Sequence, residues 1–153
     1  MAKLIMLIGI PGSGKTTYSK ELIVKYNAQV VSSDKVRQTY VGIDESEVFP
    51  TVYRMCNEYL SKGIDVILDA THITPKVRKR SFDALDAYNV EYEKIAYYFD
   101  TPVDVCVRRV DKRNQDPNEL QLPLEVIESY GKNIIAPSKE EGFKEIYIIK
   151  SGE

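Results

Sequence analysis

The stretch that most constrains this chain runs from Gly9 to Thr16 and reads Gly-Ile-Pro-Gly-Ser-Gly-Lys-Thr. It matches the pattern G-x-x-x-x-G-K-[ST] at every position. The apolar run 3–8 before it predicts a buried strand, and residues 17–25 after it contain no helix breaker. Strand, glycine loop and helix together form a phosphate cradle, because loop N–H groups and a helix N-terminus face the anion. A chance glycine-rich turn is the alternative, and the flanking pattern argues against it.

The motif assigns roles to single residues. We expect Lys15 to reach the β- and γ-phosphates of a nucleoside triphosphate and the Thr16 hydroxyl to ligate Mg²⁺. GTPases read guanine with an Asn-Lys-x-Asp signature, which this sequence lacks, so we expect ATP. The predicted nucleotide-binding residues are contiguous: Gly9, Ile10, Pro11, Gly12, Ser13, Gly14, Lys15, Thr16 and Thr17.

Length, composition and charge narrow the class of protein. The 153 residues suit one domain, and 43% hydrophobic with 29% charged residues is ordinary for a soluble globular protein. A net charge of −2 argues against a protein that grips long nucleic acid, so any such contact should be short and local. No apolar run is long enough to span a membrane, and we expect a cytoplasmic protein. Cys56 and Cys106 lack metal-ligand spacing and are interpreted as reduced core residues, in preference to reactive thiols.

Strand-like and helix-like patterns alternate along the rest of the chain. Such alternation predicts βαβ units and a parallel sheet. The expected fold is α/β: a P-loop NTPase with three layers, α/β/α, around a five-stranded parallel sheet, in a single domain 1–153 with a helical lid at about residues 108–136. The further strands are expected at 29–33, 64–69, 91–99 and 143–150, and the further helices at 34–40, 48–60, 75–88, 103–113 and 122–134.

Local signals set several element ends. We expect Ser33 or Asp34 to cap the short helix after the second strand, and Thr74 to cap the helix that starts at Pro75. Residues 42–46 are expected to form a loop, and Pro137 is expected to stop the last helix.

Two acidic residues follow predicted strands, at the edge where such sheets bind ligands. Asp69 ends an apolar strand and is expected to organise Mg²⁺, usually through water; capping the next turn is the alternative. Asp34 and Arg37 form the pattern D-x-x-R, one helical turn apart. Asp34 could take the proton of an attacking hydroxyl, and Arg37 could hold an anionic group of the acceptor. An exposed ion pair is the alternative.

Basic residues gather in two further places. Arg109 and Arg113 share a helix face and could close over the triphosphate from a lid; favourable charge at a helix C-terminus is the alternative. The run Lys76, Arg78, Lys79 and Arg80 could rim an anionic acceptor site or form a solvated face. The single histidine, His72, follows a strand and is expected to make a turn hydrogen bond and no chemistry.

This ordered set resembles the polynucleotide kinase-like P-loop kinases, the family of the kinase domain of phage T4 and bacterial 5′-end-healing polynucleotide kinases. The P-loop alone is widely shared, whereas the ordered set is much more specific. Nearly the whole chain carries the resemblance, through residues 9–16, 33–37, 69–72, 109–113, 123–127 and 140–143.

The resemblance implies ATP-dependent transfer of the γ-phosphate to the 5′-OH of DNA or RNA. It implies that Asp34 is the general base and that Arg37 contacts the phosphate on the 3′ side of the acceptor nucleoside. It also implies that Arg109 and Arg113 act from the lid. The sequence departs from the family at His72, where Asn is frequent, and it lacks a phosphatase Asp-x-Asp-x-Thr motif, so a kinase alone is expected.

Two other function classes remain open from the sequence. A small-molecule kinase for a sugar, nucleoside or other metabolite would keep the P-loop, Asp34 and the lid arginines. A non-catalytic nucleotide-binding switch would tolerate loss of Asp34, and the presence of Asp34 with the arginines argues against it. An open basic groove leading to Asp34 would favour the polynucleotide, and a closed pocket would favour the metabolite.

Overall fold

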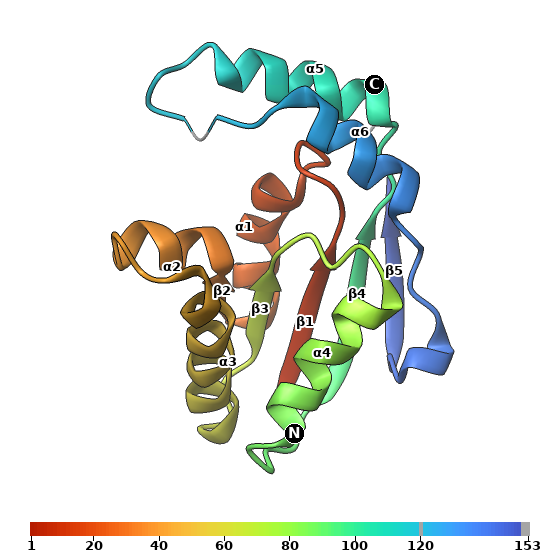
Figure 1. The fold of residues 1–153 in the computed structure, drawn as a ribbon. Coiled ribbons are helices and arrows are strands. Elements are labelled where there is room, and N and C mark those ends of the chain that lie inside the picture. The colour runs from red at the N-terminus through yellow and green to blue at the C-terminus, as the bar shows by residue number, and fades with distance from the viewer. Residues whose placement is uncertain (120, 151–153) are drawn as a thin grey trace.

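A computed structural model describes residues 1–119 and 121–150. Its five strands form one parallel sheet in the order β2-β3-β1-β4-β5, with β1 at the centre (Figure 1). Every neighbouring pair is parallel, so the predicted parallel sheet is confirmed. The strands are β1 Lys3–Ile8, β2 Gln29–Ser32, β3 Val66–Asp69, β4 Glu93–Phe99 and β5 Glu145–Ile149.

Helices cover both faces of this sheet, which confirms the predicted three-layer α/β/α fold class. Helix α1 packs on one face, and α3 and α4 pack on the other (Figure 1). Helices α5 and α6 lie across the edge at which the strands end (Figure 1). The helices are α1 Lys15–Tyr26, α2 Ser33–Thr39, α3 Glu45–Ser61, α4 Pro75–Asp86, α5 Val103–Asn114 and α6 Leu124–Asn133, with a 3-10 turn η1 at Lys139–Glu141.

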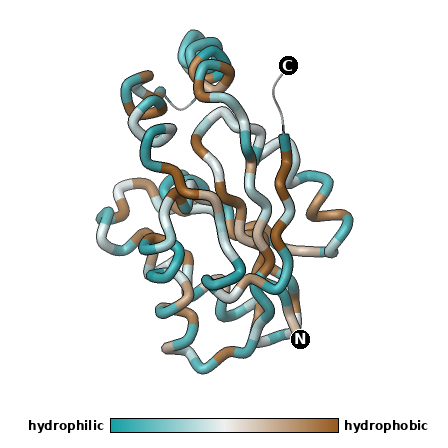
Figure 2. The backbone as a smooth tube through the Cα atoms, turned by 90° about the vertical axis from the view of Figure 1, so that its right-hand side faces the viewer, coloured by the Kyte–Doolittle hydropathy of each residue, from teal (hydrophilic) through white to brown (hydrophobic). Residues whose placement is uncertain are grey.

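The core forms on the two faces of β1. Leu4 and Met6 point to the cluster under α3 and α4, while Ile5 and Leu7 point to the cluster under α1, and all four are fully buried. Figure 2 shows the apolar segments gathered along the central strands. A strand covered on both faces needs a continuous apolar run, which is why the sequence before the glycine loop does not alternate. Cys56 and Cys106 are free and buried, as predicted.

Some predicted element ends are confirmed and others are wrong. Thr74 caps α4, because its side chain accepts a hydrogen bond from the Val77 N–H. The cap of α2 is Ser32, and not Ser33 or Asp34, because Ser32 is still extended and its hydroxyl accepts from the Lys35 N–H. Helix α3 begins at Glu45 behind an Asp44 cap, so the predicted 42–46 loop is too long.

The last helix also ends earlier than expected. Helix α6 finishes at Asn133, four residues before Pro137, which was expected to stop it, because Ile134 is already extended. Within residues 1–119 and 121–150, no helix is both long and apolar enough to span a bilayer.

Helices α5 and α6 pack closely on one another over the sheet edge, where the sequence predicts a lid, and this helix pair is here called the lid. They share a small apolar cluster built on Ile10, Cys106, Val110 and Ile127. The two helices are close together at Gly131 of α6, where an added Cβ would lie 2.4 Å from the Val103 Cγ2 atom of α5. Because that separation is far below van der Waals contact, a glycine is needed for the two helices to approach this closely.

Gly131→Ala should therefore destabilise the protein, even though alanine is the better helix former. We expect a loss of about 1–3 kcal/mol in the free energy of unfolding, the usual effect of overpacking. Denaturant unfolding measures it. The double variant Gly131→Ala, Val103→Ala removes the obstructing methyl groups, and it should recover part of the loss; additive losses would contradict this account.

Candidate active site at the sheet edge

The phosphate-loop motif forms the connection between β1 and α1. Gly12 and Gly14 have φ angles of 83° and 102°, a left-handed conformation that residues with side chains rarely adopt. An added Cβ on Gly12 would also lie 2.7 Å from the Cys106 carbonyl oxygen in α5. The glycines therefore shape the loop and let the lid helix approach it.

Lys15, the first residue of α1, lies folded into this loop. Its Nζ donates to the carbonyl oxygens of Gly9 at 2.6 Å and Ile10 at 3.2 Å. Burial lowers the pKa of Lys15 to about 8, although the Asp69 carboxylate opposes the change. Burial raises the pKa of Asp69, and Lys15 opposes that change in turn. The ammonium and the carboxylate are thus close enough in a poorly solvated site to influence each other's charge.

Strand register explains why the predicted residues meet. Asp69, the last residue of β3, pairs with Leu7 of β1 and with Ser32 of β2. The glycine loop follows Leu7 by two residues, and Asp34 follows Ser32 by two. Three chain segments distant in sequence therefore end at one edge of the sheet, as expected from parallel pairing.

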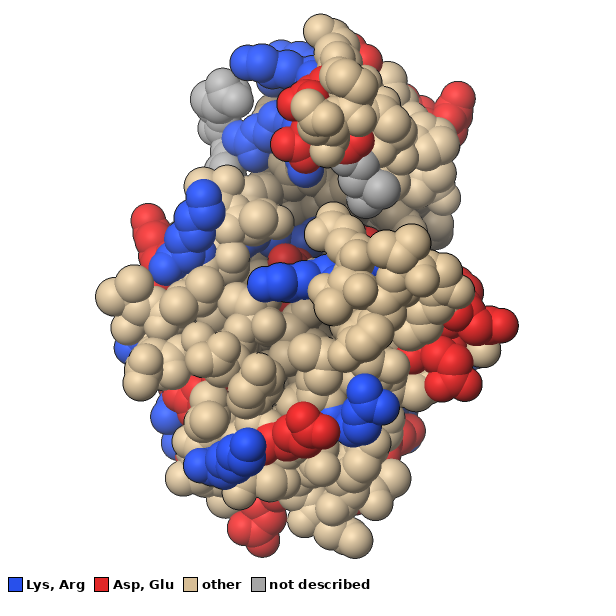
Figure 3. All heavy atoms as spheres, turned by 90° about the vertical axis from the view of Figure 1, so that its left-hand side faces the viewer, with Lys and Arg blue, Asp and Glu red and all other residues tan. Residues whose placement is uncertain are grey.

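A cleft of about 1460 Å³ opens at this edge beneath the lid. Figure 3 shows it as a hollow with basic and acidic atoms on its walls. Three residues of the loop, Gly9, Ile10 and Ser13, are buried and do not line the cleft. The other predicted site residues do: Pro11, Gly12, Gly14, Lys15, Thr16, Thr17, Asp34, Arg37, Asp69, Arg109 and Arg113.

Asp34 and Arg37 are paired on the wall of this cleft, with 2.9 Å between Asp34 Oδ1 and Arg37 Nη1. Glu45, at the start of α3, holds the same guanidinium, accepting from Nη2 at 2.6 Å and from Nε at 2.9 Å. The bond from Arg37 lowers the pKa of Glu45. Sequence reasoning missed Glu45 because the residue was assigned to a loop. The Asp44 cap beside it was the available signal.

Two lid residues reach the cleft from α5. Arg109 Nη1 donates to the Gly12 carbonyl at 3.0 Å, which joins the lid directly to the glycine loop. Arg113, one turn further along α5, also lines the cleft, as the four-residue spacing predicts. Below them, Thr101 Oγ1 donates to the Ser13 carbonyl at 2.8 Å. One polar contact from α5 and one from Thr101, which precedes this helix, therefore hold this segment to the phosphate loop.

The turn after β3 is held to strand β1 by the side chain of His72. His72 has a positive φ of 49° and is buried, and its Nδ1 lies 2.9 Å from the Leu7 carbonyl oxygen of β1. A hydrogen bond was expected for His72, but its partner is a carbonyl of strand β1 and not a group within the turn. Burial lowers the pKa of His72 to about 4, so the ring is neutral at physiological pH. A neutral ring with Nδ1 on a carbonyl carries its proton on Nδ1.

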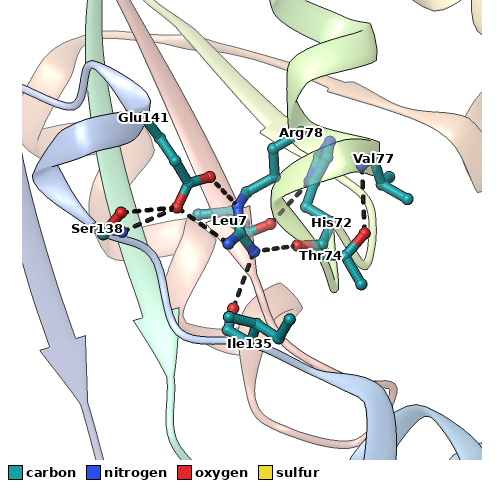
Figure 4. Close-up of polar contacts among 8 residues, drawn as sticks. All are labelled: Leu7, His72, Thr74, Val77, Arg78, Ile135, Ser138 and Glu141. Atoms are coloured by element: carbon teal, nitrogen blue, oxygen red, sulfur yellow. Dashed lines mark hydrogen bonds and ion pairs between the residues drawn. The ribbon is translucent and has the colours of Figure 1, made fainter.

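Arg78 holds this turn and the chain that returns from the lid. Its side chain has no exposed surface; Nη1 donates to the carbonyls of His72 at 2.8 Å and Ile135 at 3.0 Å (Figure 4). Its Nε and Nη2 donate to the two carboxylate oxygens of Glu141 at 2.7 and 3.1 Å. Of the predicted basic run, Arg78 is therefore structural. Lys79 lies on the solvated face, paired with Asp83.

The described residues contain no group of three or more His, Cys, Asp or Glu side chains arranged to hold a metal. Thr16 and Asp69 both line the cleft, and together they offer one hydroxyl and one carboxylate. Mg²⁺ is commonly held by one or two protein groups, with phosphate and water as its other ligands. This pair therefore fits a magnesium ion that arrives with a nucleotide.

Comparisons with known proteins establish the family. A family model described as "AAA domain" (AAA_33) matches residues 4–137, and the chain belongs to this family of P-loop kinases. An Acanthamoeba polyphaga mimivirus protein, named as a candidate bifunctional polynucleotide phosphatase/kinase, is 27% identical over 96% of this chain and 33% of its own length. The adenylate kinase of Thermococcus kodakarensis is 30% identical over 74% of this chain and 57% of its own length. The chain spans 33–58% of the curated relatives it matches.

Solved structures give the same fold. One from Chloroflexus aurantiacus, described as a candidate kinase, has a TM-score of 0.77 at 18% identity and covers 99% of this chain and 89% of its own. Chaetomium thermophilum Kti12 in complex with ADP-AlF3 has a TM-score of 0.74 at 17% identity and covers 96% of this chain and 88% of its own. These likenesses show that this chain shares its fold with both proteins.

Arg78→Met should destabilise the protein strongly, because it leaves Glu141 and two carbonyl oxygens without their donor. We expect a loss of about 3–5 kcal/mol in the free energy of unfolding, the range for breaking a buried ion pair. Lys79→Met, which breaks the exposed pair one residue away, is the matched control and should change it by less than about 0.5 kcal/mol. Equal losses would show that Arg78 does not anchor the turn.

Nucleotide binding should take up protons above pH 8. The pKa of Lys15 is about 8 without ligand, so its ammonium loses its proton as pH rises through that value. A bound triphosphate favours the charged form and raises the pKa again. ADP affinity should therefore fall between pH 8 and 9.5, with proton uptake visible by calorimetry in buffers of different ionisation enthalpy. Lys15→Arg stays charged across this range, and its affinity should be flat there; a similar decline in both proteins would exclude Lys15 as the cause.

Proposed function

We propose that this protein is an ATP-dependent kinase that transfers the γ-phosphate to the 5′-OH end of DNA or RNA. The observation that carries the proposal is the Asp34–Arg37 pair, joined at 2.9 Å on the wall of the cleft that also contains Lys15 and Asp69. A carboxylate and a guanidinium in one place can serve an acceptor that presents a hydroxyl beside a phosphodiester. The similarity to the mimivirus protein over 96% of this chain also supports it.

The nucleotide side of the mechanism follows from the phosphate loop. Loop N–H groups and Lys15 would bind the phosphates of the nucleotide, and Thr16 and Asp69 would hold Mg²⁺. The magnesium ion would neutralise negative charge on the phosphates. Arg109 and Arg113 approach from the lid and stabilise the charge that spreads over the transferred group.

The acceptor side uses Asp34. The acceptor oxygen bonds to the γ-phosphorus, the bond from that phosphorus to the β–γ bridging oxygen breaks, and ADP leaves. Because the transition state of phosphoryl transfer is loose, the base needs only to orient the hydroxyl and take its proton late. Asp34 has a 58% exposed side chain, so a hydroxyl can approach it from the cleft. The proton ends on the Asp34 carboxylate.

Glu45 refines the role of Arg37. Its carboxylate, 70% exposed, neutralises the guanidinium while no acceptor is bound. Exposed pairs of this kind contribute only about 0–1 kcal/mol, so the phosphodiester of an acceptor can displace Glu45 from Arg37. This exchange gives Arg37 a place to bind an anion without leaving an unpaired charge beforehand.

A small-molecule kinase is the second candidate, and the same pair of carboxylates favours it. Arg37 is already bonded to Asp34 and Glu45, and the chain carries a net charge of −2. A neutral acceptor hydroxyl would use Asp34 while Arg37 kept both partners. A small-molecule kinase needs no anionic group on its acceptor. The comparison below of acceptors with and without a 3′-phosphate separates the two candidates.

Asp34→Asn should remove phosphate transfer and spare nucleotide binding, because the amide keeps the size of the side chain but cannot take a proton. We expect transfer of labelled γ-phosphate from ATP to a 5′-OH oligonucleotide to fall about 10²–10⁴-fold. ADP affinity should stay within about twofold of wild type. Glu45→Gln is the matched control on the same guanidinium, and it should retain most of the activity.

Other results of these transfer and binding measurements would contradict the proposed roles of Asp34 and Arg37 or the proposed acceptor. If Asp34→Asn lost nucleotide binding and transfer equally, Asp34 would be structural. If wild type bound ATP but phosphorylated no oligonucleotide, the polynucleotide proposal would be wrong and a metabolite acceptor would replace it. Arg37→Ala should raise the KM for an acceptor with a 3′-phosphate more than for the same nucleoside without one. An equal effect on both would remove the phosphate-binding role of Arg37.

A further inference from the structure

A second cavity of about 270 Å³ lies between α3 and α4, beside the main cleft. Phe49, Ala70 and Thr71 line both cavities, so the two are adjacent. Phe49 lies one helical turn after Glu45, which bonds Arg37. An acceptor placed at Asp34 and Arg37 is therefore next to this second cavity.

The walls of this cavity, here called the α3–α4 pocket, are mainly apolar and aromatic. Phe49 and Tyr53 come from α3, with ring centroids 5.9 Å apart and planes tilted by 40°. Val77 faces them from α4 and is half-buried. Tyr53 is anchored through its hydroxyl to Ser81 Oγ at 3.0 Å. An anchored aromatic wall is suited to a flat ring, since stacking does not depend on the identity of the ring.

One polar atom of a residue that lines the pocket makes no hydrogen bond with the described residues. His72 lines the pocket and is buried, and its Nε2 makes no hydrogen bond within the described residues. Nδ1 faces the Leu7 carbonyl and carries the proton, so Nε2 presents a lone pair on the other side of the ring. A buried acceptor without a donor is unfavourable by about 1–3 kcal/mol, which an N–H donor from a ligand would relieve.

The pocket also has one basic side chain, because Arg80 is exposed and lines it. The ligand that fits these features has a flat ring, an N–H donor at its edge and a nearby anion. The volume lies just below the roughly 300–1000 Å³ of typical drug-sized sites, which suits a single heterocycle.

We propose that the α3–α4 pocket binds the nucleobase of the acceptor's terminal nucleoside, with a base N–H donating to His72 Nε2. The proposal rests on the proposed function and names the acceptor as a nucleoside end rather than a sugar alone. Every nucleobase has an N–H donor and a flat face, so the pocket selects for a base without selecting one base.

The single histidine makes a direct test possible. The imidazole nitrogen resonances in a ¹⁵N spectrum belong to His72 alone. Titration with adenosine or cytidine should move the Nε2 resonance upfield as its lone pair accepts a hydrogen bond, whereas a ribose analogue without a base should leave it unchanged. A resonance that moves with neither nucleoside would overturn the proposal. This readout does not depend on phosphate transfer.

A variant that fills the α3–α4 pocket tests the proposal by enzyme kinetics. Val77→Phe should occupy the pocket. The matched control is Val24→Phe, at a position of α1 that is 82% exposed. The acceptors are two 5′-OH oligonucleotides, one with a normal first nucleotide and one with an abasic first residue. In wild type and Val24→Phe, the abasic acceptor should have a KM roughly 5- to 100-fold higher, from the loss of one stacked base. In Val77→Phe the two KM values should be equal, with the KM for ATP unchanged.

The outcomes separate this proposal from the proposed function. Wild type that uses both acceptors equally well would exclude the pocket and leave the polynucleotide kinase intact. Wild type that phosphorylates neither acceptor would overturn the proposed function, and the His72 resonance would then decide the pocket alone. If Val77→Phe does not fold, as judged by thermal unfolding, the wild-type acceptor comparison and the resonance test still decide it.

Discussion

The parallel pairing of β1 between β3 and β4 is the constraint on which the site depends. Parallel strands end at one edge, and their backbone bonds fix which residues lie opposite one another. This pairing sets Asp69 opposite Leu7 and Ser32, and so brings the glycine loop and Asp34 to the same place. A shift of one residue would turn the buried side chains of β1 to the wrong face, so the core and the site share one register.

The lid depends on a second constraint, the buried guanidinium of Arg78. It holds the turn after β3 through the His72 carbonyl and holds the chain leaving α6 through the Ile135 carbonyl. The Ile135 N–H also donates to the Ile73 carbonyl at 2.8 Å, so the two segments are joined twice. Within α5, Arg109 bonds the glycine loop. The helix pair is therefore attached at two places to the parts of the sheet edge that form the cleft.

Charge within the cleft is largely balanced by the protein itself. Glu45 and Asp34 hold Arg37, and Asp69 influences the buried Lys15. Such an arrangement avoids isolated charges in a poorly solvated place, and it lets an anionic ligand exchange for a carboxylate without a large desolvation penalty. The near-neutral chain and the basic residues of the cleft are consistent with each other, because Arg37 and Lys15 each have a nearby acid.

The sequence by itself determined the fold class, the phosphate loop, the parallel sheet and the edge at which the predicted site residues meet. These follow from local patterns: an apolar run, the glycines of the loop motif and regular strand–helix alternation. Only the tertiary structure decided that Arg78 is buried, that Glu45 holds Arg37 and that His72 Nε2 accepts no hydrogen bond from the residues that the structure describes. Lys76, Arg78, Lys79 and Arg80 look alike in sequence, and the face of α4 on which each lies depends on what packs there. Contacts between residues 63 positions apart, such as Arg78 and Glu141, leave no local pattern and exist only once the chain has folded.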